Sequence, residues 1–272
     1  MKVTRLDLGG FELAVHEVGE GPVVALGHSL TFDHQMFQHQ VTTLAQKHRV
    51  LLFDLHGQGQ SGAPEEYFTL DDIADDLDRA LEMLGAKEVC WLGHSMGGMV
   101  GMRLAIRHPQ RVGALVLMNT SAEAEPREIQ DLYHHVNEGS RGLPSNKTTV
   151  DFLLGLMFSA GFRESQPERV AFFEDQLYNP PNPEGVYFAA HAVIWRDDVR
   201  ESLASIDVPA LIISAEDDSS VPPKHQEKIA EHLPGSRLVR IASCGHLSPV
   251  EQPGVVLGHI DEFLSKHWGT DE

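Results

Sequence analysis

The pentapeptide Gly93-His94-Ser95-Met96-Gly97 is the segment whose residue types and spacing could most directly carry chemistry. It follows an apolar run, residues 89–92, that is typical of a buried strand, and it precedes a helix-like segment, residues 99–107. A serine on a sharp turn between strand and helix is held in a strained conformation, with its hydroxyl at the carboxyl edge of a sheet. We therefore predict that Ser95 is a nucleophile, with an idle serine in a glycine-rich turn as the alternative.

A serine hydroxyl is a poor nucleophile until a base takes its proton, so two further residues are needed. In a strand–turn–helix arrangement of this kind, the partners follow the serine in the order acid, then histidine. His246 lies in a loop after one strand-like segment and is the predicted general base. Asp218 lies at the end of another and is the predicted acid that orients the imidazole, with Asp217 and Glu216 as rivals.

An acyl-transfer site also needs hydrogen-bond donors for the oxyanion that develops on the substrate. We predict that one donor is the backbone N–H of Met96, directly after the nucleophile. The second would be the backbone N–H of Leu30, in the loop after the third strand-like segment. His28 in the same loop is predicted either to brace it by hydrogen bonding or to be solvated, and it is also a candidate for the substrate pocket.

The segments that must position these residues alternate between strand-like and helix-like patterns. Two alternating stretches around Gly9-Gly10 predict a β-hairpin, and short apolar runs predict strands that are covered on both faces. The predicted strands span residues 3–8, 11–18, 22–27, 49–55, 88–93, 112–118, 210–214 and 237–242. The predicted helices span residues 37–47, 69–84, 97–108 and 223–233, and a final helix follows His246. The expected fold class is therefore α/β, with a mostly parallel sheet and helices on both faces.

The alternation of strands and helices breaks between residues 121 and 206. Only helical patterns occur there, at residues 128–137, 149–160, 166–177 and 185–199. We therefore predict one catalytic core, residues 1–121 and 207–272, that is interrupted by a helical cap, residues 122–206. The cap would cover the catalytic edge of the sheet and shape the substrate pocket.

Two groups of cap residues are candidates for that pocket. His191 and Trp195 are four residues apart, so a helix would place them on one face, where they could reach the substrate. For Trp195, packing inside the cap is the favoured alternative. Five apolar residues between Phe152 and Phe158 could also line the pocket, although packing of the cap onto the core is favoured for them.

The composition restricts the partners and cofactors of the chain. Its 272 residues include 40 acidic and 21 basic side chains, and a formal net charge of −19 disfavours nucleic acid and anionic membranes as partners. No apolar run is long enough to cross a membrane, and the N-terminus has no apolar signal core. With only two cysteines, Cys90 and Cys244, a cytoplasmic location is expected. The 16 histidines show no metal-binding spacing, so we expect no bound metal and expect most of the histidines to be solvated surface residues.

The motifs make the chain resemble the α/β-hydrolase superfamily over nearly its whole length. The resemblance is carried by GHS at 27–29, DLHGQGQSG at 54–62, GHSMGG at 93–98, EDDSSVPP at 216–223 and CGHLSPVEQP at 244–253. In that superfamily the acid usually lies four residues before a proline, as Asp218 lies before Pro222. The turn at residues 54–61 is generally structural there, and His56 stands where arginine is commonest.

Within the superfamily, the chain is most similar to 3-oxoadipate enol-lactonases and their esterase relatives. The similarity rests on residues 28–30 and 36–37 and on several stretches between residues 182 and 209. It implies a cofactor-free hydrolase with a helical cap. Three positions depart from the pattern: Thr31 and Ala215 stand where glycine is usual, and Phe37 where tryptophan is usual.

The expected reaction is hydrolysis of a carboxylic ester or lactone of a small molecule through an acyl-enzyme on Ser95. Carbon–carbon bond hydrolases and perhydrolases of the same fold share the serine triad and stay as alternatives, as does a small-molecule sensor with little turnover. Dehalogenases and epoxide hydrolases of this fold place an aspartate at the nucleophile position, so Ser95 excludes their chemistry.

Overall fold

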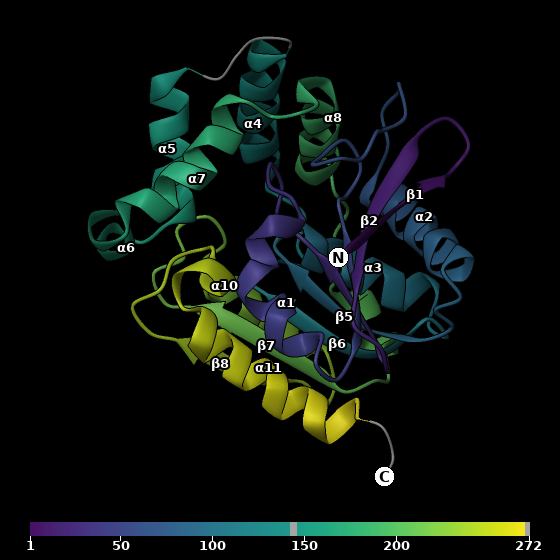
Figure 1. Cartoon of the computed structure of the whole chain (residues 1–272). Coiled ribbons are helices and arrows are strands. Elements are labelled where there is room, and N and C mark those ends of the chain that lie inside the picture. The colour runs from purple at the N-terminus through teal and green to yellow at the C-terminus, as the bar shows by residue number, and fades with distance from the viewer. Residues whose placement is uncertain (142–145, 270–272) are drawn as a thin grey trace.

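The computed structural model describes residues 1–141 and 146–269, which are built around one eight-stranded sheet (Figure 1). The strands are β1 (Lys2–Asp7), β2 (Glu12–Val18), β3 (Val23–Gly27), β4 (Arg49–Phe53), β5 (Val89–His94), β6 (Val112–Met118), β7 (Ala210–Ala215) and β8 (Arg237–Ile241). Their order is β1-β2-β4-β3-β5-β6-β7-β8. β1 and β4 both pair antiparallel with β2, and the other neighbours are parallel. The predicted hairpin and mostly parallel sheet are confirmed.

Helices cover both faces of the sheet. They are α1 (Gln38–Leu44), α2 (Leu70–Met83), α3 (Met96–Arg107), α9 (Lys224–His232), α10 (Ser248–Glu251) and α11 (Pro253–His267), with the 3₁₀ helix η1 (His34–Phe37) before α1. Alternate residues of the central strands belong to different hydrophobic clusters, as expected when both faces are buried. Phe53 and Trp91 pack in the cluster with α2 and α3, whereas Leu52 and Leu92 pack in the cluster with α1 and α11.

The start of α2 shows how the local sequence determines where a helix begins. Thr69 and Asp72 form a capping box, in which Thr69 Oγ1 accepts the N–H of Asp72 over 3.1 Å. The Asp72 carboxylate in turn accepts the N–H of Thr69 over 2.8 Å. Both contacts satisfy backbone donors that a helix N-terminus leaves unpaired, so α2 begins where the sequence predicts it.

Between β6 and β7 the described residues form helices only, as predicted. These are α4 (Arg127–Ser140), α5 (Lys147–Met157), α6 (Ala160–Ser165), α7 (Pro167–Tyr178), α8 (Pro183–Ile194) and the 3₁₀ helix η2 (Glu201–Ser205). α6 was not expected, because six residues are too few to show a helical period. α8 ends five residues before its predicted end, where Arg196 donates to the carbonyl oxygens of Val193 and Glu123 over 2.9 and 2.8 Å. The division of the chain into a core and a cap, residues 142–145 of which lie outside the described residues, stays a prediction.

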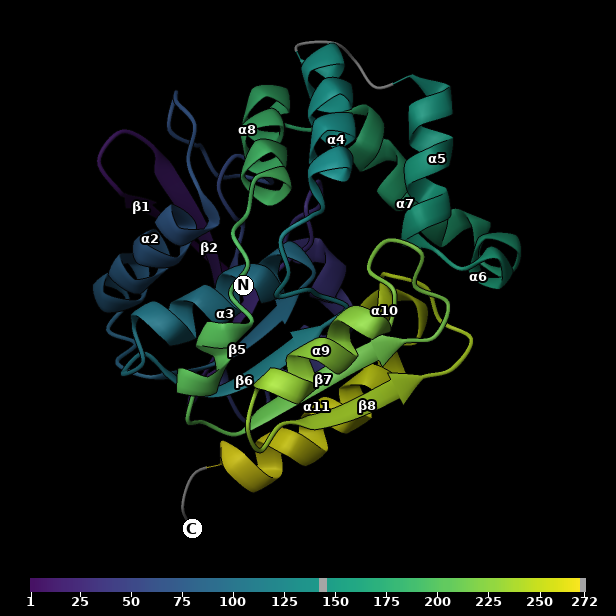
Figure 2. The same ribbon diagram turned by 180° about the vertical axis from the view of Figure 1, so that it is seen from behind.

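This helical insertion has two halves that pack on different parts of the molecule. α8 lies beside α4, and its Tyr187, Phe188 and Ala192 join the hydrophobic cluster of α2 and α3 (Figures 1 and 2). The buried residues of α5, α6, α7 and the link between α5 and α6 join the cluster of α1 and α11: Val150, Leu154, Phe158, Phe162, Val170, Phe173 and Leu177. We call these the α4/α8 half and the α5–α7 half. Phe158 packs onto the core as favoured, but Phe152 is 61% exposed, so for Phe152 the packing prediction is wrong. None of the described helices has the length and apolar character needed to cross a bilayer.

Candidate active site

Ser95 lies in the sharp turn between β5 and α3. Its φ of 51° and ψ of −114° form a backbone conformation that residues other than glycine rarely adopt. Backbone packs tightly around the turn: a Cβ on Gly97 would lie 2.0 Å from the Gly27 carbonyl oxygen, and one on Gly93 would lie 2.3 Å from that of Gly97. The spacing of glycines around Ser95 is therefore a steric requirement of the turn, and Ser95 keeps 8% of its surface exposed.

His246 and Asp218 form a buried pair at the ends of β8 and β7. His246 Nδ1 lies 2.9 Å from Asp218 Oδ2, and both side chains are fully buried. Asp218 Oδ1 accepts the backbone N–H groups of Ser220 and Val221 over 2.9 and 2.8 Å. Because the carboxylate accepts, His246 carries its proton on Nδ1, and the buried Nε2 has no hydrogen-bond partner among the described residues. The rivals for the acid, Asp217 and Glu216, are both exposed.

Asn119 contacts the His246–Asp218 pair, although no sequence motif reveals it. It follows β6, is fully buried and has a φ of 49°. Its Nδ2 donates to Asp218 Oδ2 over 2.9 Å, and its Oδ1 accepts the hydroxyl of Ser248 over 2.6 Å. The amide therefore holds the same carboxylate oxygen as His246. The available signal was weak: an asparagine directly after a strand at the edge where the other candidates gather.

His94, next to Ser95, contacts the predicted base from the other side. Its Nε2 lies 2.8 Å from the carbonyl oxygen of His246, and the two rings are 4.9 Å apart. Burial lowers the pKa of His94 well below its usual range, and the charge of His246 lowers it further. His94 is therefore neutral, and its Nε2–H donates to His246. Ser95 and His246 are brought into the same part of the structure through this contact.

The two predicted oxyanion donors come from neighbouring segments: Leu30 lies in the loop after β3, and Met96 lies at the start of α3. Gly97 N–H donates to the carbonyl oxygen of His28 over 3.0 Å, which joins the start of α3 to the loop of Leu30. Within the described chain, the backbone N–H groups of Leu30 and Met96 donate to no other residue. These two N–H groups are thus free to bind an acceptor on a ligand.

His28 braces the loop, and the alternative of a solvated His28 is wrong. The residue is fully buried, its Nδ1–H donates to Ser29 O over 2.7 Å, and its Nε2 accepts Leu55 N–H over 2.8 Å. Burial lowers the pKa of His28, although the charge of Asp54 opposes this shift. Since both ring nitrogens bind backbone, a direct contact of His28 with substrate stays a prediction without a free polar atom to support it.

The predicted cap residues His191 and Trp195 lie together around a cavity of about 200 Å³. Its lining is formed by the start of α2, by Arg103 of α3 and by α8 with the residues that follow it: Tyr67, Phe68, Thr69, Leu70, Asp71, Arg103, His191, Ala192, Trp195, Arg196 and Asp197. The Trp195 ring also contacts His134 of α4, with ring centroids 5.5 Å apart, as in the packing alternative. Ser95 does not line this cavity, so the assignment of His191 and Trp195 to a substrate pocket stays a prediction.

The histidines are much less exposed than the composition suggested. Seven of the 16 are buried, six are partly exposed and three are exposed, so nine are at least partly solvated and the composition did not reveal the burial of the other seven. The buried ones are His16, His28, His34, His48, His56, His94 and His246. Three of them, His28, His94 and His246, contact specific backbone or carboxylate groups, as described above.

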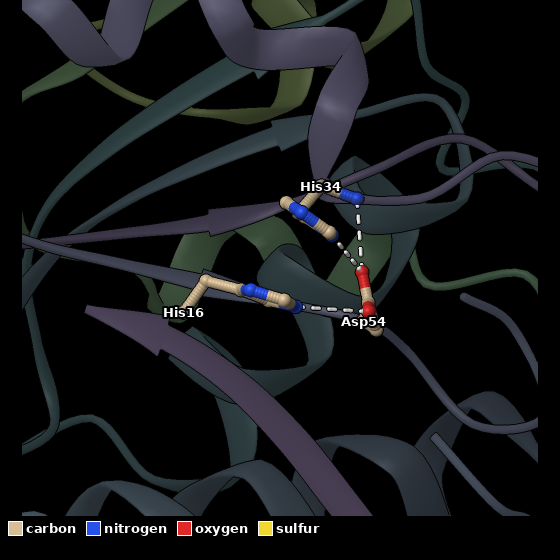
Figure 3. Close-up of side chains that lie close together, drawn as sticks. All are labelled: His16, His34 and Asp54. Atoms are coloured by element: carbon tan, nitrogen blue, oxygen red, sulfur yellow. Dashed lines mark hydrogen bonds and ion pairs between the residues drawn. The ribbon is translucent and has the colours of Figure 1, made fainter. Parts of the chain in front are cut away.

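Two further buried histidines surround Asp54 (Figure 3). The His16 and His34 rings stack with centroids 3.5 Å apart, and His16 Nε2 and His34 Nδ1 lie 3.1 and 2.8 Å from different oxygens of Asp54. Their donor atoms are close enough together to be considered for a metal ion. Both carboxylate oxygens, however, also accept a backbone N–H, from His34 and Gln60, at 2.9 Å each. Each carboxylate oxygen therefore accepts two hydrogen bonds, which uses its full capacity as an acceptor. These hydrogen bonds hold the turn at residues 54–61 in place.

The charged forms of Asp54 and His34 stabilise each other. Burial opposes the charge of Asp54, but the hydrogen bonds from His16 and His34 outweigh it and hold the pKa of Asp54 far below its usual range. Burial likewise opposes protonation of His34, and the hydrogen bond and charge of Asp54 outweigh it and raise the pKa of His34. Asp54 is therefore ionised and fixes the turn electrostatically as well as by hydrogen bonds.

Comparison with known proteins agrees with this architecture. A model of the alpha/beta hydrolase fold family matches residues 21–253. 3-Oxoadipate enol-lactonase 2 of Acinetobacter baylyi is 30% identical over 249 residues, covering 91% of this chain and 90% of that protein. The solved structure of a thermophilic esterase from Thermogutta terrifontis has a TM-score of 0.91 at 29% identity, covering 98% of this chain and 100% of that one. Karrikin insensitive 2 receptor IA of Petunia hybrida is 28% identical, with 94% of this chain and 96% of that protein covered. The resemblance noted from the motifs is confirmed, and the chain belongs to the alpha/beta hydrolase fold family.

Proposed function

We propose that this protein is a serine hydrolase that cleaves a carboxylic ester or lactone of a small molecule. The observation that carries the proposal is the buried His246–Asp218 pair, in which the imidazole is oriented by the carboxylate and its Nε2 has no partner among the described residues. An imidazole held in this tautomer has its other nitrogen available as a general base. The exposed fraction of Ser95, on a strained turn beside His94, supports its role as the nucleophile.

In the proposed reaction, Ser95 Oγ attacks the carbonyl carbon while His246 Nε2 accepts the hydroxyl proton. The tetrahedral intermediate then collapses, the carbon–oxygen bond of the leaving group breaks, and the proton on His246 leaves with the alcohol. Water then attacks the acyl carbon while the same nitrogen accepts a proton from it. The second tetrahedral intermediate collapses, the bond from the acyl carbon to Ser95 Oγ breaks, and His246 returns the proton to Ser95 as the acid is released. The Asp218 carboxylate orients His246 and stabilises the imidazolium that forms.

The N–H groups of Leu30 and Met96 would bind the oxyanion in both tetrahedral intermediates. Support for this comes from their lack of other acceptors within the described residues. The helical insertion, residues 122–206, would act as the cap over this edge. The reduced state expected for a cytoplasmic protein agrees with two cysteines that are free and buried, and the location itself stays a prediction.

The test is covalent labelling with a fluorophosphonate, combined with a screen of p-nitrophenyl esters, γ-lactones and enol-lactones. Ser95→Ala should lose labelling and at least about a thousandfold in kcat, because the nucleophile is gone. Ser121→Ala is a matched control, since Ser121 is a buried serine in the loop that follows the neighbouring strand β6. Labelling or turnover that survives in Ser95→Ala would overturn the proposal.

A second candidate is a small-molecule sensor, and one relative favours it: the Petunia hybrida protein is named a receptor. A sensor would bind its ligand tightly and release little product. Single- and multiple-turnover kinetics on the preferred ester or lactone separate the two, since a hydrolase regenerates free Ser95 in every cycle. Carbon–carbon bond hydrolysis and perhydrolysis would use the same three residues, and the substrate screen should include one compound of each kind.

A further inference from the structure

A strained residue lies next to one of the two proposed oxyanion donors. Thr31, which follows Leu30, has a φ of 72°, in the left-handed region that favours glycine and is unfavourable for a β-branched residue. Strain of this kind persists only where the surrounding structure holds it in place. The contacts of Thr31 therefore show what fixes the backbone of the oxyanion loop.

Gln58 makes the contact that holds Thr31. Its Oε1 accepts the N–H of Thr31 over 2.6 Å, and the Gln58 residue is only 1% exposed. The hydroxyl of Thr31 also donates to Leu30 O over 2.6 Å, so the strained residue is held on both sides. This hydrogen bond is part-buried, and its loss carries a cost because it leaves the N–H of Thr31 without its acceptor.

Gln58 itself is placed by the turn at residues 54–61. Gln58 N–H donates to Leu55 O, and Gln58 O accepts Ser61 N–H, both over 3.0 Å. The same turn is fastened through Asp54 by the buried His16 and His34 (Figure 3). The position of the Gln58 amide is therefore determined by a rigid part of the molecule outside the oxyanion loop.

The other end of the Gln58 amide reaches the second proposed donor residue. Gln58 Nε2 lies 3.9 Å from Met96 Sδ, a weak acceptor. One buried side chain thus contacts the residue after Leu30 and the side chain of Met96, on the two sides of the oxyanion site. Gln58 lies within the motif at residues 54–62, but the motif assigns no role to its side chain.

We propose that Gln58 is a positioning residue that fixes the oxyanion loop by holding Thr31 in its left-handed conformation. The inference rests on the proposed function, because it concerns the same site. Without the acceptor on Gln58, Thr31 relaxes toward negative φ, and the backbone around Leu30 moves with it. The Leu30 N–H then no longer points where the oxyanion forms, and transition-state stabilisation falls while ground-state binding is retained.

A double-mutant cycle tests the proposal. Gln58→Met removes the amide and keeps the chain length, and should lower kcat about tenfold to a hundredfold with KM changed by less than about threefold. Thr31→Gly alone should leave kcat within about twofold, because glycine adopts a positive φ without strain. Combined with Thr31→Gly, Gln58→Met should lower kcat by less than about threefold, because the loop no longer needs to be held.

Two controls separate positioning from a general loss of structure. Thr31→Ala keeps the unfavourable positive φ, so it should not rescue Gln58→Met. Gln40→Met removes another buried glutamine, which donates to Pro249 O over 2.9 Å, and should leave the hydrogen exchange of the Thr31 N–H within about twofold, because Gln40 does not contact Thr31. If Gln58→Met does not fold alone, its effect is measured in the Thr31→Gly background, where the same limit of about threefold applies. Unchanged kcat in Gln58→Met, or equal rescue by Thr31→Ala, would overturn the proposal.

Hydrogen exchange gives a readout that does not depend on hydrolysis. The N–H of Thr31 should exchange at least about tenfold faster in Gln58→Met than in the unmodified protein, because its buried acceptor is gone. Unchanged exchange would contradict the inference even if activity fell. Should Ser95→Ala remain active while the exchange of Thr31 responds as expected, the proposed function fails and the contact between Gln58 and Thr31 stands.

Discussion

The two halves of the helical insertion are attached to the rest of the molecule in different ways. The α5–α7 half binds the segment that follows His246: Leu247 N–H donates to Met157 O over 3.0 Å. Ser159 donates its N–H and its hydroxyl to the Glu251 carboxylate over 2.8 and 2.6 Å. The α4/α8 half is joined through aromatic and charged side chains, such as the Tyr187 and Tyr67 hydroxyls, which are 2.8 Å apart.

This difference suggests a functional division, in which each half affects a different kinetic parameter. The α5–α7 half supports the backbone around the proposed base, so changes there should act on kcat. The α4/α8 half borders the cavity of about 200 Å³ with His191 and Trp195. We predict that this cavity receives part of the substrate, so changes there should act on KM and on substrate preference. Both halves bury apolar residues in the core, so their contribution to stability does not distinguish them.

Among changes that test the attachment of the two halves, the largest effect is expected from Gly245→Ala, which breaks the attachment of the α5–α7 half. A Cβ at this position would lie 2.4 Å from Ser159 N and 2.5 Å from Glu251 Oε1, so backbone next to His246 must move. We expect kcat to fall about a hundredfold and the free energy of unfolding to fall by about 1–3 kcal/mol. Ester hydrolysis and urea unfolding measure the two effects.

Gly161→Ala is the matched control, because a Cβ at this position of α6 would meet nothing within 4 Å. It should keep full activity and gain up to about 1 kcal/mol of stability from the better helix former. Equal kcat in Gly245→Ala and Gly161→Ala would show that the α5–α7 half does not support the base.

Glu251→Gln should have a smaller effect on the same attachment. The carboxylate accepts two donors from Ser159, and an amide offers one oxygen and a competing N–H₂ group. We expect a loss of about 1–3 kcal/mol in the free energy of unfolding and a fall in kcat of less than about tenfold. Thermal unfolding and steady-state kinetics check both values. A change in KM with constant kcat would assign Glu251 to substrate binding and contradict the proposed division.

Much of the fold could be predicted, because strands and helices leave local patterns. Residues 112–118 were predicted as a strand and form β6 with the same bounds. The end of α8 could not be found in this way, because Arg196 is bound there by Glu123, 73 residues away in the sequence. Likewise, the burial of His16 depends on Asp54, which is 38 residues away. Composition alone made His16 look like a surface residue.

The residues of the candidate site also differ in whether the local sequence reveals them. Ser95, Asp218 and His246 could be proposed because their order and their places after strands follow from local sequence. Asn119 and Gln58 could not, because each acts through a single side chain whose partners are brought close only by the sheet and its connections. Tertiary contacts of this kind leave no periodic signal.

His191→Ala tests the other half of the comparison. The centroid of the His191 ring lies 4.2 Å from that of the Tyr67 ring, and His191 lines the cavity of about 200 Å³, so its removal enlarges the space beside α8. We expect KM to change by about threefold to tenfold, differently for short and long acyl chains, with kcat nearly constant. A series of p-nitrophenyl esters gives the measurement. A uniform fall in kcat for all chain lengths would place His191 with the catalytic machinery instead.

The smallest effect is expected at the base of the α4/α8 half, from Glu123→Gln. Glu123 binds His225 and Lys228 of α9 over 2.7 and 2.5 Å. Burial opposes its charge, but these partners outweigh burial and lower the pKa of Glu123. A carboxyl whose pKa is lower in the folded state stabilises the protein above its unfolded pKa, and this contribution is lost as the pH falls from there through the folded pKa. Between pH 7 and pH 3, the unmodified protein should therefore lose about 0.5–1 kcal/mol more stability than Glu123→Gln, as measured by urea unfolding.

Activity at pH 7 should be unchanged in Glu123→Gln, because this ionic contact holds the half that does not support the base. A fall in kcat like that of Glu251→Gln would mean that both halves act on the catalytic loop, and the comparison would fail. An identical pH dependence of stability in both proteins would show that the ion pairs of Glu123 do not contribute to holding the α4/α8 half. The contrast between the halves would then rest on the hydrogen bonds of Ser159 and Leu247.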